Sequence, residues 1–251
     1  MKLYGLIGYP LSHSFSKGYF TEKFRKENIS DSQYENYPID SIDKVIDTIK
    51  SNSALIGLNV TIPYKEQVIQ YLDETDEAVK EIGAVNTIKI KRENAKIYLK
   101  GYNTDVYGFK NSIVPLFNRQ NYKALILGTG GASKAIKYIL NKLNINFLSA
   151  SIEELKENEI RYNEIDENMI KDRLLIINAT PLGTYPNINT CPDIPYNAIT
   201  PNHILFDLVY NPSETLFLKQ GKQNGAKIKN GLEMLHLQAE KSYEIWNNPN
   251  L

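Results

Sequence analysis

The stretch Lys123-Ala124-Leu125-Ile126-Leu127-Gly128-Thr129-Gly130-Gly131-Ala132-Ser133 decides the fold of this chain. An apolar strand runs directly into a glycine-rich turn, and Lys134–Leu143 follows as a helix with apolar residues along one side. Glycines allow a tight turn and a close approach of the backbone to a pyrophosphate, which meets the helix N-terminus. A purely structural glycine turn is the alternative. The order of strand, turn and helix favours a dinucleotide-binding domain.

The next predicted strand, Asn146–Ser149, should end at the residue that chooses the cofactor. An acidic residue there holds the ribose hydroxyls of NAD, whereas an arginine accepts the 2′-phosphate of NADP. This chain offers Ser149-Ala150-Ser151, which is neither. The run Ser151–Glu154 also fits a helix capping box, so Ser151 has a structural explanation. The residues alone therefore do not choose between NAD and NADP.

The remainder of this half continues the alternation of strands and helices. Its further predicted strands are Arg173–Asn178, Ile204–Val209 and the short Ala226–Lys229. A final helix follows Gly231 with four apolar residues at helical spacing, Leu232, Leu235, Ala239 and Trp246. Such a stripe predicts a core face, and Gln238 lies on the same helix.

Strands and helices also alternate at the start of the chain, which predicts an α/β unit with a mostly parallel sheet. The predicted strands are Lys2–Gly8, Tyr34–Ile39 and Leu55–Ile62, and the predicted helices are Lys17–Lys26, Ile42–Ser51, Tyr64–Leu72 and Glu74–Ile82. Ile88–Lys91 and Lys96–Lys100 alternate apolar and polar residues, which indicates a hairpin with one wet face. We expect this hairpin to form a sheet edge that its lysines protect from other chains.

Lys65 follows the apolar strand closely, and Pro63 before it suits the first position of a helix. Lys65 would then lie in the first turn, where the partial positive charge of the helix disfavours a cation unless a carboxylate answers it. Asp105, which opens a helix through about Phe117, is the candidate carboxylate. The alternatives are a solvated surface lysine and an acid that only complements its own helix dipole.

Ser14 and Ser16 lie between the first strand and its helix, together with Ser12 and His13. Ligands of open α/β sheets bind beyond the carboxyl ends of the strands, so these hydroxyls are candidates to bind an oxygen-rich substrate. The alternative is that Ser14 or Ser16 only caps the helix. A catalytic triad built on His13 has no nucleophile motif to support it.

Length and composition narrow the class of protein. The 251 residues suit two domains, and 29 basic and 29 acidic residues give no net charge that would favour nucleic acid or an anionic membrane as a partner. Cys191 is the only cysteine, and His13, His203 and His236 lack metal-ligand spacing, so no metal site is expected. No apolar run reaches the roughly 20 residues of a membrane span. We expect a soluble, cytoplasmic protein with a small-molecule substrate.

Several separated motifs together resemble the shikimate dehydrogenase family. They are Gly8–Leu11 with Ser14–Ser16, Asn59–Lys65, Gly83–Thr87, Asn103–Asp105, Gly128–Ser133, Asn178–Gly183 and Gly231–Gln238. They span nearly the whole chain in the family's order. The resemblance implies reversible, NADP-dependent reduction of 3-dehydroshikimate to shikimate in chorismate and aromatic amino-acid biosynthesis. It also implies a substrate-binding domain of residues 1–105 and 232–251 and a Rossmann-like dinucleotide-binding domain of residues 106–231.

The resemblance further implies roles for individual residues. Lys65 and Asp105 would be the catalytic pair. The substrate would be bound by Ser14 and Ser16 at its carboxylate and by Thr61, Asn86 and Gln238 at its ring hydroxyls, with Tyr210 nearby. The cofactor would be bound by Gly128, Gly130, Gly131, Ala132 and Ser133 at the pyrophosphate, by Ser149 after the second strand, and by Thr180, Leu208 and Gly231 on the nicotinamide side.

The chain departs from the family pattern in two places. Lys17 stands where the family usually has a proline, which should alter only the helix start. Ser149-Ala150-Ser151 replaces the arginine-containing signature of NADP-type members, and the acidic segment 149–166 should repel a 2′-phosphate. An NAD-using quinate/shikimate dehydrogenase and a dinucleotide-binding sensor without turnover are therefore alternatives. The sequence allows a monomer or a homodimer.

Overall fold

The computed structural model describes residues 1–11 and 14–250, so Ser12 and His13 lie outside the described residues. The chain divides into two compact units, one of Met1–Thr104 with Ala239–Leu251 and the other of Asp105–Gln238. The second division falls within the last helix, α8 (Leu232–Asn247), which contributes residues to both units. Sequence had placed that boundary at the start of the helix.

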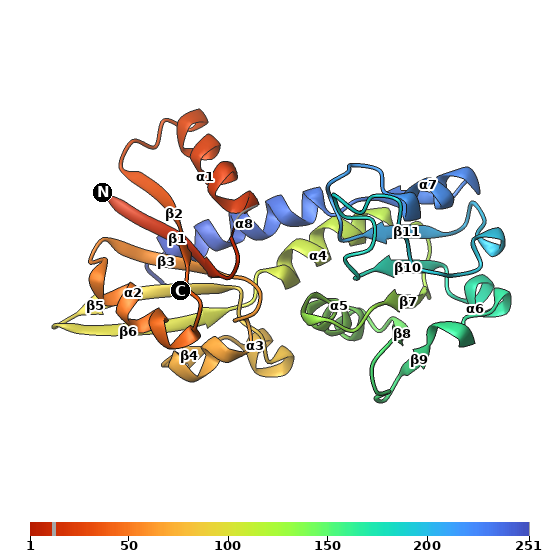
Figure 1. Cartoon of the computed structure of the whole chain (residues 1–251), viewed down its shortest axis with the longest axis horizontal. Helices are drawn as coiled ribbons and strands as arrows, with labels where there is room; N and C mark the ends of the chain where they lie inside the picture. The colour runs from red at the N-terminus through yellow and green to blue at the C-terminus, as the bar shows by residue number, and fades with distance from the viewer. Residues whose placement is uncertain (12–13, 251) are drawn as a thin grey trace. The chain divides into compact units, whose positions relative to one another are not determined.

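The first unit is an α/β domain built on one six-stranded sheet (Figure 1). Its elements in chain order are β1 (Lys2–Gly8), α1 (Phe15–Lys26), β2 (Ser32–Pro38), the 3₁₀ helix Ile42–Lys44, α2 (Val45–Ser51), β3 (Leu55–Val60), the 3₁₀ helix Gln67–Tyr71, β4 (Glu74–Thr75), α3 (Glu77–Ile82), β5 (Thr87–Glu93) and β6 (Lys96–Tyr102). The strand order is β2-β1-β3-β5-β6-β4. The α/β class is confirmed, but the sheet is mixed because the hairpin β5–β6 joins β3 antiparallel.

The hairpin differs from the expectation in two respects. It is not the edge of the sheet, because β4 pairs with β6 outside it, and β4 occupies residues assigned to the helix Glu74–Ile82. Lys89 is also buried, and its ammonium donates to the carbonyl oxygen of Ile245 at 2.8 Å and to that of Asn248. The alternating sequence pattern predicted that Lys89 faces solvent, but the C-terminal end of α8 covers its side chain.

The expected helix Tyr64–Leu72 is replaced by a turn and the 3₁₀ helix Gln67–Tyr71. The amide of Tyr64 donates to the carbonyl of Thr61 at 2.9 Å, and the buried Tyr64 hydroxyl donates to the carbonyl of Ile39 at 2.7 Å. These tertiary contacts fix the backbone in a turn before a helix can begin. Lys65 therefore lies in the turn rather than at a helix N-terminus, and the helix-dipole argument for a paired carboxylate does not apply to it.

Helix α8 is anchored on the first sheet by an aromatic cluster. The ring of Trp246 stacks on Tyr4 at 5.0 Å between centroids, and its indole nitrogen donates to the carbonyl of Ile88 at 3.0 Å. Gly57 faces the same indole, and a Cβ there would lie 2.3 Å from it. The absence of a side chain on β3 thus lets the helix approach the sheet.

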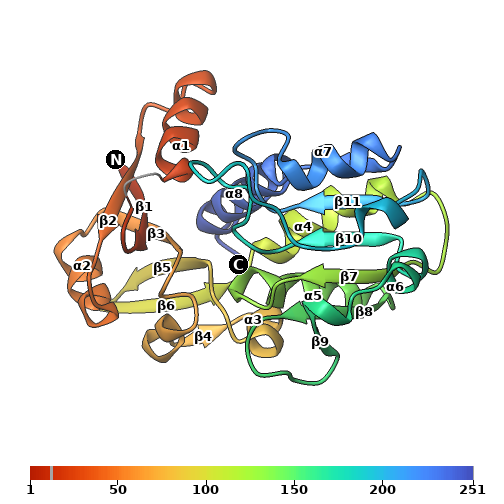
Figure 2. The ribbon, with the colours of Figure 1, turned by 45° about the vertical axis from the view of Figure 1, so that its right-hand side comes forward.

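The second unit is a doubly wound domain around an all-parallel six-stranded sheet. Its elements are α4 (Asp105–Ile113), the 3₁₀ helix Val114–Leu116, β7 (Lys123–Leu127), α5 (Gly131–Lys142), β8 (Asn146–Ser151), β9 (Glu159–Arg161), the 3₁₀ helix Tyr162–Glu164, α6 (Glu167–Asp172), β10 (Leu175–Asn178), the 3₁₀ helix Tyr196–Ala198, β11 (Ile204–Asp207), α7 (Leu216–Gln223), β12 (Lys227–Lys229) and the first part of α8. The strand order is β12-β11-β10-β7-β8-β9, and Figure 2 shows β11, β10, β7 and β8 side by side. The chain reverses direction across the sheet between β7 and β10, which is where ligands bind in such folds. The expected Rossmann-like domain is confirmed.

The link between β8 and β9 departs from the sequence analysis. No helix follows Ser151, so the expected capping box does not exist; the Ser151 hydroxyl instead accepts from the amide of Glu153 at 3.1 Å. The link Ile152–Asn158 has no helix and leads directly into β9, a strand that sequence missed. Leu232, expected in the core, is 37% exposed at the start of α8.

Candidate active site

The carboxyl ends of β1 and β3 are joined to the turn that carries Lys65. The amide of Thr61 donates to the carbonyl of Ile7 at 3.0 Å, and the amide of Val85 donates to the carbonyl of Lys65 at 2.7 Å. The amide of Val60 donates to the carbonyl of Asn86 at 2.9 Å. These backbone hydrogen bonds hold Thr61, Lys65 and Asn86 at one end of the first sheet.

Asn86 is held in one orientation by its neighbours. Its side chain is 3% exposed, and its Oδ1 accepts from the Thr104 amide at 2.7 Å and from the Thr104 and Thr87 hydroxyls at 3.1 Å each. A backbone N–H can only donate, so it fixes the amide oxygen on that side and turns the NH₂ group the other way. The arrangement presents Asn86 as an oriented hydrogen-bond donor.

Asn59 is the centre of the buried polar network behind Asn86. Its Oδ1 accepts from the Tyr34 hydroxyl at 2.8 Å, and its Nδ2 lies 3.1 Å from the Ser242 hydroxyl of α8 and 3.3 Å from that of Thr87. The Thr87 and Ser242 hydroxyls are 2.8 Å apart. Because buried polar groups are costly when unpaired, this closed network gives the end of the sheet one stable arrangement.

The two candidate serines differ in their surroundings. Ser14 occupies the N-cap position of α1 but makes no capping hydrogen bond, so the capping alternative fails for its side chain. Its Oγ is buried and has no partner among the described residues. Burial raises the pKa of Tyr34, and a hydrogen bond from Ser16 opposes that shift. Ser16 is thereby linked to the network around Asn59.

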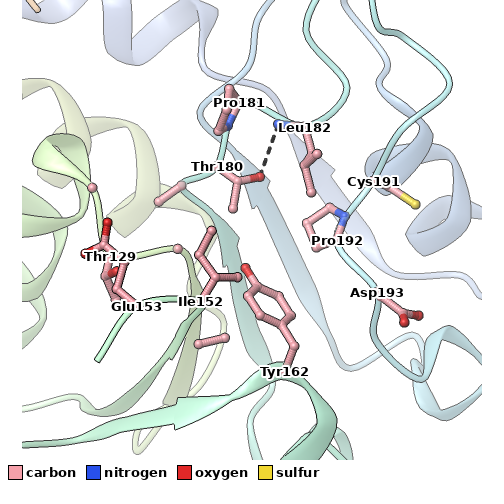
Figure 3. A pocket seen from close by; sticks show the side chains of 14 residues that line it. Thr129, Ile152, Glu153, Tyr162, Thr180, Pro181, Leu182, Cys191, Pro192 and Asp193 are labelled. Carbon is pink, nitrogen blue, oxygen red and sulfur yellow. Dashed lines mark hydrogen bonds between the residues drawn. The ribbon is translucent and has the colours of Figure 1, made fainter. Parts of the chain in front are cut away.

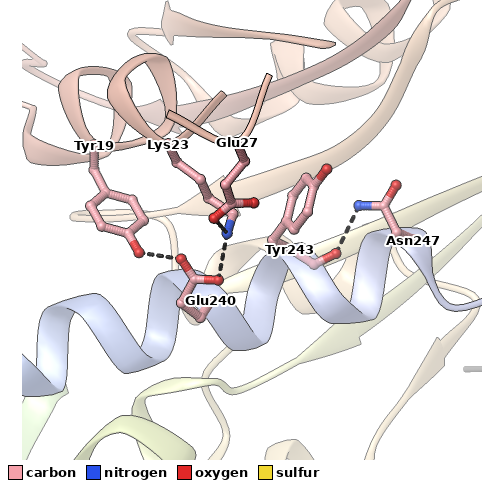
Figure 4. A network of polar contacts seen from close by, with 6 residues as sticks. All are labelled: Tyr19, Lys23, Glu27, Glu240, Tyr243 and Asn247. Atoms are coloured by element: carbon pink, nitrogen blue, oxygen red, sulfur yellow. Dashed lines mark hydrogen bonds and ion pairs between the residues drawn. The ribbon is translucent and has the colours of Figure 1, made fainter. Parts of the chain in front are cut away.

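Helix α1, which follows the serines, is fastened to α8 by a polar cluster shown in Figure 4. The Tyr19 hydroxyl donates to Glu240, and the Lys23 ammonium lies 2.8 Å from the same carboxylate. Lys23 also pairs with Glu27 of its own helix at 2.7 Å. These contacts fix α1, and with it Ser14 and Ser16, relative to α8 within the first unit.

A pocket of about 550 Å³ opens at the carboxyl ends of β7, β8 and β10 in the second unit (Figure 3). It is lined by Gly128, Thr129, Gly130, Ala150, Ile152, Glu153, Tyr162, Ala179, Thr180, Pro181, Leu182, Cys191, Pro192 and Asp193. Figure 3 shows Ile152 and Tyr162 on one side of it and Thr180 and Pro181 on the other. The pocket lies where the strand order reverses, and its size and apolar walls suit part of a dinucleotide.

The glycine turn has the conformation that phosphate binding needs. Gly128 adopts a φ of +101°, and a Cβ there would lie 2.9 Å from the Thr180 side chain. Gly130 and Gly131 face open space at the start of α5, with no atom within 4 Å of the place that a Cβ would take. The Ser133 hydroxyl donates to the carbonyl of Gly130 at 2.7 Å and so stabilises the turn. Backbone N–H groups at such a helix start favour an anion.

Thr180 is positioned by a second buried polar group. Its amide and hydroxyl donate to Asn178 Oδ1 at 3.0 and 2.6 Å, and Asn178 Nδ2 donates to Asp207 at 3.0 Å. Asp207 also accepts from the amide of Val209 at 3.0 Å and from the Thr215 hydroxyl. Burial raises the pKa of Asp207 to about 6, although these three hydrogen bonds favour the carboxylate.

Only some of the expected cofactor-binding residues line the pocket. Gly128, Gly130 and Thr180 line the pocket. Gly131, Ala132, Ser133, Ser149, Leu208 and Gly231 do not line it. Ser149 is fully buried inside β8, and Gly231 faces the carbonyl of Leu208, where a Cβ would lie 2.2 Å from the oxygen.

Sequence analysis did not identify several pocket residues, among them Ile152, Glu153 and Tyr162. Only the strand assignment of β9 could have drawn attention to Tyr162, because it follows that strand directly. Of the remaining candidates, Lys65 belongs to the first unit, whereas Asp105, Tyr210 and Gln238 belong to the second. Asp105 is the first residue of α4, as expected.

Within residues 1–11 and 14–250, no group of three or more His, Cys, Asp or Glu side chains is arranged to hold a metal ion. In the same part of the chain, no helix is both long and apolar enough to cross a membrane.

Comparison with known proteins gives matches along almost the whole chain. Residues 6–88 match the family model described as the shikimate dehydrogenase substrate binding domain. A shikimate dehydrogenase (NADP(+)) of Methanococcus maripaludis is 40% identical over 98% of this chain and 91% of its own length. The crystal structure of shikimate dehydrogenase 1 from Peptoclostridium difficile has a TM-score of 0.81 at 40% identity and covers 98% of this chain and 91% of that one.

A more distant structure carries both kinds of ligand. Shikimate 5-dehydrogenase from Thermus thermophilus, solved in complex with NADP(H) and shikimate, has a TM-score of 0.83 at 25% identity over 98% of this chain and 94% of that one. With 40% identity over nearly the full length of a curated relative, the resemblance seen in the sequence motifs is confirmed. The chain belongs to the shikimate dehydrogenase family.

Proposed function

We propose that the chain is an NADP-dependent shikimate dehydrogenase, which interconverts shikimate and 3-dehydroshikimate in the biosynthesis of chorismate and the aromatic amino acids. One observation carries the proposal: the buried network that orients Asn86 beside Thr61 and the Lys65 turn at the end of the first sheet. A ring that bears several hydroxyls and a carboxylate needs several directed polar groups. The relatives' names support the same reaction.

The proposed substrate residues of the first unit lie in or next to this sheet end, whereas Tyr210 and Gln238 belong to the second unit. Ser14 and Ser16 bind the carboxylate, and the buried Ser14 hydroxyl, which has no partner among the described residues, supports this role. Thr61 and Asn86 bind ring hydroxyls, with Gln238 and Tyr210 as further contacts. A buried hydroxyl that gains an acceptor on binding removes an unpaired donor, which favours the bound state.

Lys65 and Asp105 act as the acid–base pair. Reduction of the ketone leaves an alkoxide that must be protonated, so a donor is required within hydrogen-bonding reach of that oxygen. The Lys65 ammonium gives its proton to the oxygen in reduction, and the neutral amine takes it back in oxidation. Asp105 orients the amine. The backbone bond from Val85 to the Lys65 carbonyl, 2.7 Å long, restrains the base of this side chain.

The second unit fits a nicotinamide dinucleotide, which supplies the hydride donor or acceptor when bound. The open space over Gly130 and Gly131 leaves room for a pyrophosphate at the start of α5, where a side chain would intrude. Gly128, Gly130, Gly131 and Ala132 hold that group, whereas Thr180, Leu208 and Gly231 border the nicotinamide. The second unit thus serves the cofactor, and the first unit supplies Ser14, Ser16, Thr61 and Asn86 to the substrate. A reducing compartment such as the cytoplasm suits the single Cys191.

Steady-state oxidation of shikimate by the purified chain with NADP tests the proposal, with formation of NADPH followed by absorbance. Quinate is assayed in parallel as the competing substrate. We expect shikimate to be oxidised with the higher kcat/KM. A preference for quinate would replace the substrate in the proposal, and absence of turnover with both acids would indicate a binding protein instead.

A further inference from the structure

The end of β8 is the position from which a Rossmann-type domain contacts the adenosine ribose. Here the residue after the strand is Ile152, which is 86% exposed, and Glu153 follows it and lines the pocket. The hydrogen bonds of Glu153 in the described part of the chain involve its backbone: its amide donates to the Ser151 hydroxyl, and its carbonyl accepts from Arg161. Its carboxylate has no hydrogen bond or ion pair there. A carboxylate at this place is the group that accepts from the ribose 2′-hydroxyl of NAD.

No lysine or arginine is among the residues that line the pocket, which instead carry two carboxylates, Glu153 and Asp193. A 2′-phosphate adds close to two negative charges, so it would need a cation to offset the repulsion. Lys137 is engaged by Glu159 at 2.8 Å. Lys156 lies in the link Ile152–Asn158, whereas the Arg161 side chain contacts the backbone of Glu153, so Arg161 is the better candidate cation.

Arg161 approaches the end of β8 from the neighbouring strand. The short link Ile152–Asn158 brings β9 back beside β8 in parallel, with Arg161 opposite Ser151. The Arg161 guanidinium donates through one nitrogen to the backbone carbonyl of Glu153. A guanidinium has five N–H donors, so this contact leaves others for a phosphate. The next residue, Tyr162, lines the pocket.

We propose that an acidic residue, Glu153, and a basic residue, Arg161, both contact the 2′ position of the adenosine ribose, so that the chain binds NAD and NADP with similar affinity. Glu153 accepts from the 2′-hydroxyl of NAD, and Arg161 pairs with the 2′-phosphate of NADP, while Glu153 repels that phosphate. The opposed effects leave little discrimination. This inference rests on the proposed function only for the identity of the cofactors, because it concerns binding and not turnover.

Calorimetric titration of the purified chain with NAD⁺ and with NADP⁺, without shikimate, tests these roles of Glu153 and Arg161. We expect the two Kd values to lie within about tenfold of one another, because a carboxylate and a guanidinium oppose each other at the 2′ position. Arg161→Met should weaken NADP⁺ by roughly ten- to hundredfold, the value of a charge-assisted hydrogen bond, and change NAD⁺ less than about twofold. Glu153→Gln should weaken NAD⁺ and strengthen NADP⁺, each by about fivefold.

Lys156→Met is the matched control, because it removes a cation from the link before β9 and leaves the contact between Arg161 and Glu153 in place. It should change neither Kd by more than about twofold. The inference is overturned if Arg161→Met leaves NADP⁺ binding intact, if Lys156→Met weakens it instead, or if wild type prefers one cofactor by more than about a hundredfold. Retained NAD⁺ binding by Arg161→Met shows that the variant is folded. Failure of shikimate turnover together with the expected Kd pattern would reject the proposed function alone.

Discussion

The carboxyl end of β3 in the first unit and that of β7 in the second are built from different kinds of group. Around Asn59, amide and hydroxyl side chains from β3, β5 and α8 are buried and bonded to one another. Around Gly128, glycine, alanine, proline and apolar side chains make up much of the pocket wall, with Glu153 and Asp193 as its two carboxylates, and the conformation of the glycine turn depends on a positive φ. The first site depends on hydrogen bonds between particular side chains. The glycine turn of the second depends on a backbone conformation and an open space that a side chain would disturb.

The largest effect is expected for Lys65, at the end of the first sheet, where a substitution should impair catalysis but not substrate binding. Lys65→Ala should lower kcat for shikimate by about 10²- to 10⁴-fold with little change in KM, because the variant loses the proton donor and keeps Asn86 in place. Steady-state kinetics measure both constants. Lys50→Ala, which removes an exposed lysine of α2, is the control and should match wild type. A kcat near wild type for Lys65→Ala would remove Lys65 from the mechanism.

Removing the centre of the polar network should destabilise the first unit. Asn59→Leu replaces the amide with a branched apolar group and leaves the Tyr34, Thr87 and Ser242 hydroxyls without one partner, so we expect a loss of about 3 kcal/mol in the free energy of unfolding. Urea denaturation measures it. Asn111→Leu on the exposed side of α4 should stay within about 0.5 kcal/mol. Equal stability of both variants would mean that the network orients Asn86 without stabilising the fold.

Asp207 gives the second unit its own pH dependence. Its pKa is raised from 3.8 to about 6 by burial, so the folded state binds the proton more tightly than the unfolded chain. The stabilisation is complete below pH 3.8 and is lost as pH rises through 6. Relative to Asp207→Asn, wild type should therefore lose about 2 kcal/mol between pH 4 and pH 7. Denaturation of both proteins at several pH values measures the difference; a constant difference would show that the hydrogen bonds to Asp207 cancel the effect of burial.

The smallest effects should come from the glycine turn, where two nearby substitutions test the backbone argument. Gly128→Ala forces a side chain onto a φ of +101° and against Thr180, so it should cost about 1–3 kcal/mol of stability and weaken dinucleotide binding. Gly130→Ala has a φ of −67° and open space around it, so it should change stability by less than about 0.5 kcal/mol and weaken binding only. Thermal denaturation with and without NADP⁺ separates the two. If Gly130→Ala destabilised the chain as much as Gly128→Ala, the positive φ would not be the cause.

Local patterns predicted the elements whose residues determine their own structure. Strand β7 and the glycine turn follow from an apolar run and from glycine's access to positive φ, and both are found where sequence placed them. The helix expected at Tyr64–Leu72 failed because a buried tyrosine and its bond to Ile39 hold that backbone in a turn. Such a contact joins residues far apart in the chain, which no local pattern reveals.

The same limit applies to the sites. Motifs pointed to Asn86 and Thr180, whose side chains are held by Thr87 and Asn178. Those two residues are in turn bonded to Ser242 and Asp207, which come from distant elements. Arg161 was also invisible to sequence, because its place beside Glu153 depends on how β9 pairs with β8. The sequence thus identified candidate residues at the ends of the strands better than the distant residues that hold them in place.

The most direct test of the central claim follows the hydride itself. The purified chain is incubated with NADP⁺ and shikimate deuterated at the carbon that carries the oxidised hydroxyl, and the reduced cofactor is analysed by mass spectrometry. We expect NADPH that carries the deuterium, formed together with 3-dehydroshikimate and lost in Lys65→Ala. Reduced cofactor without deuterium, or none at all while NADP⁺ still binds, would contradict it.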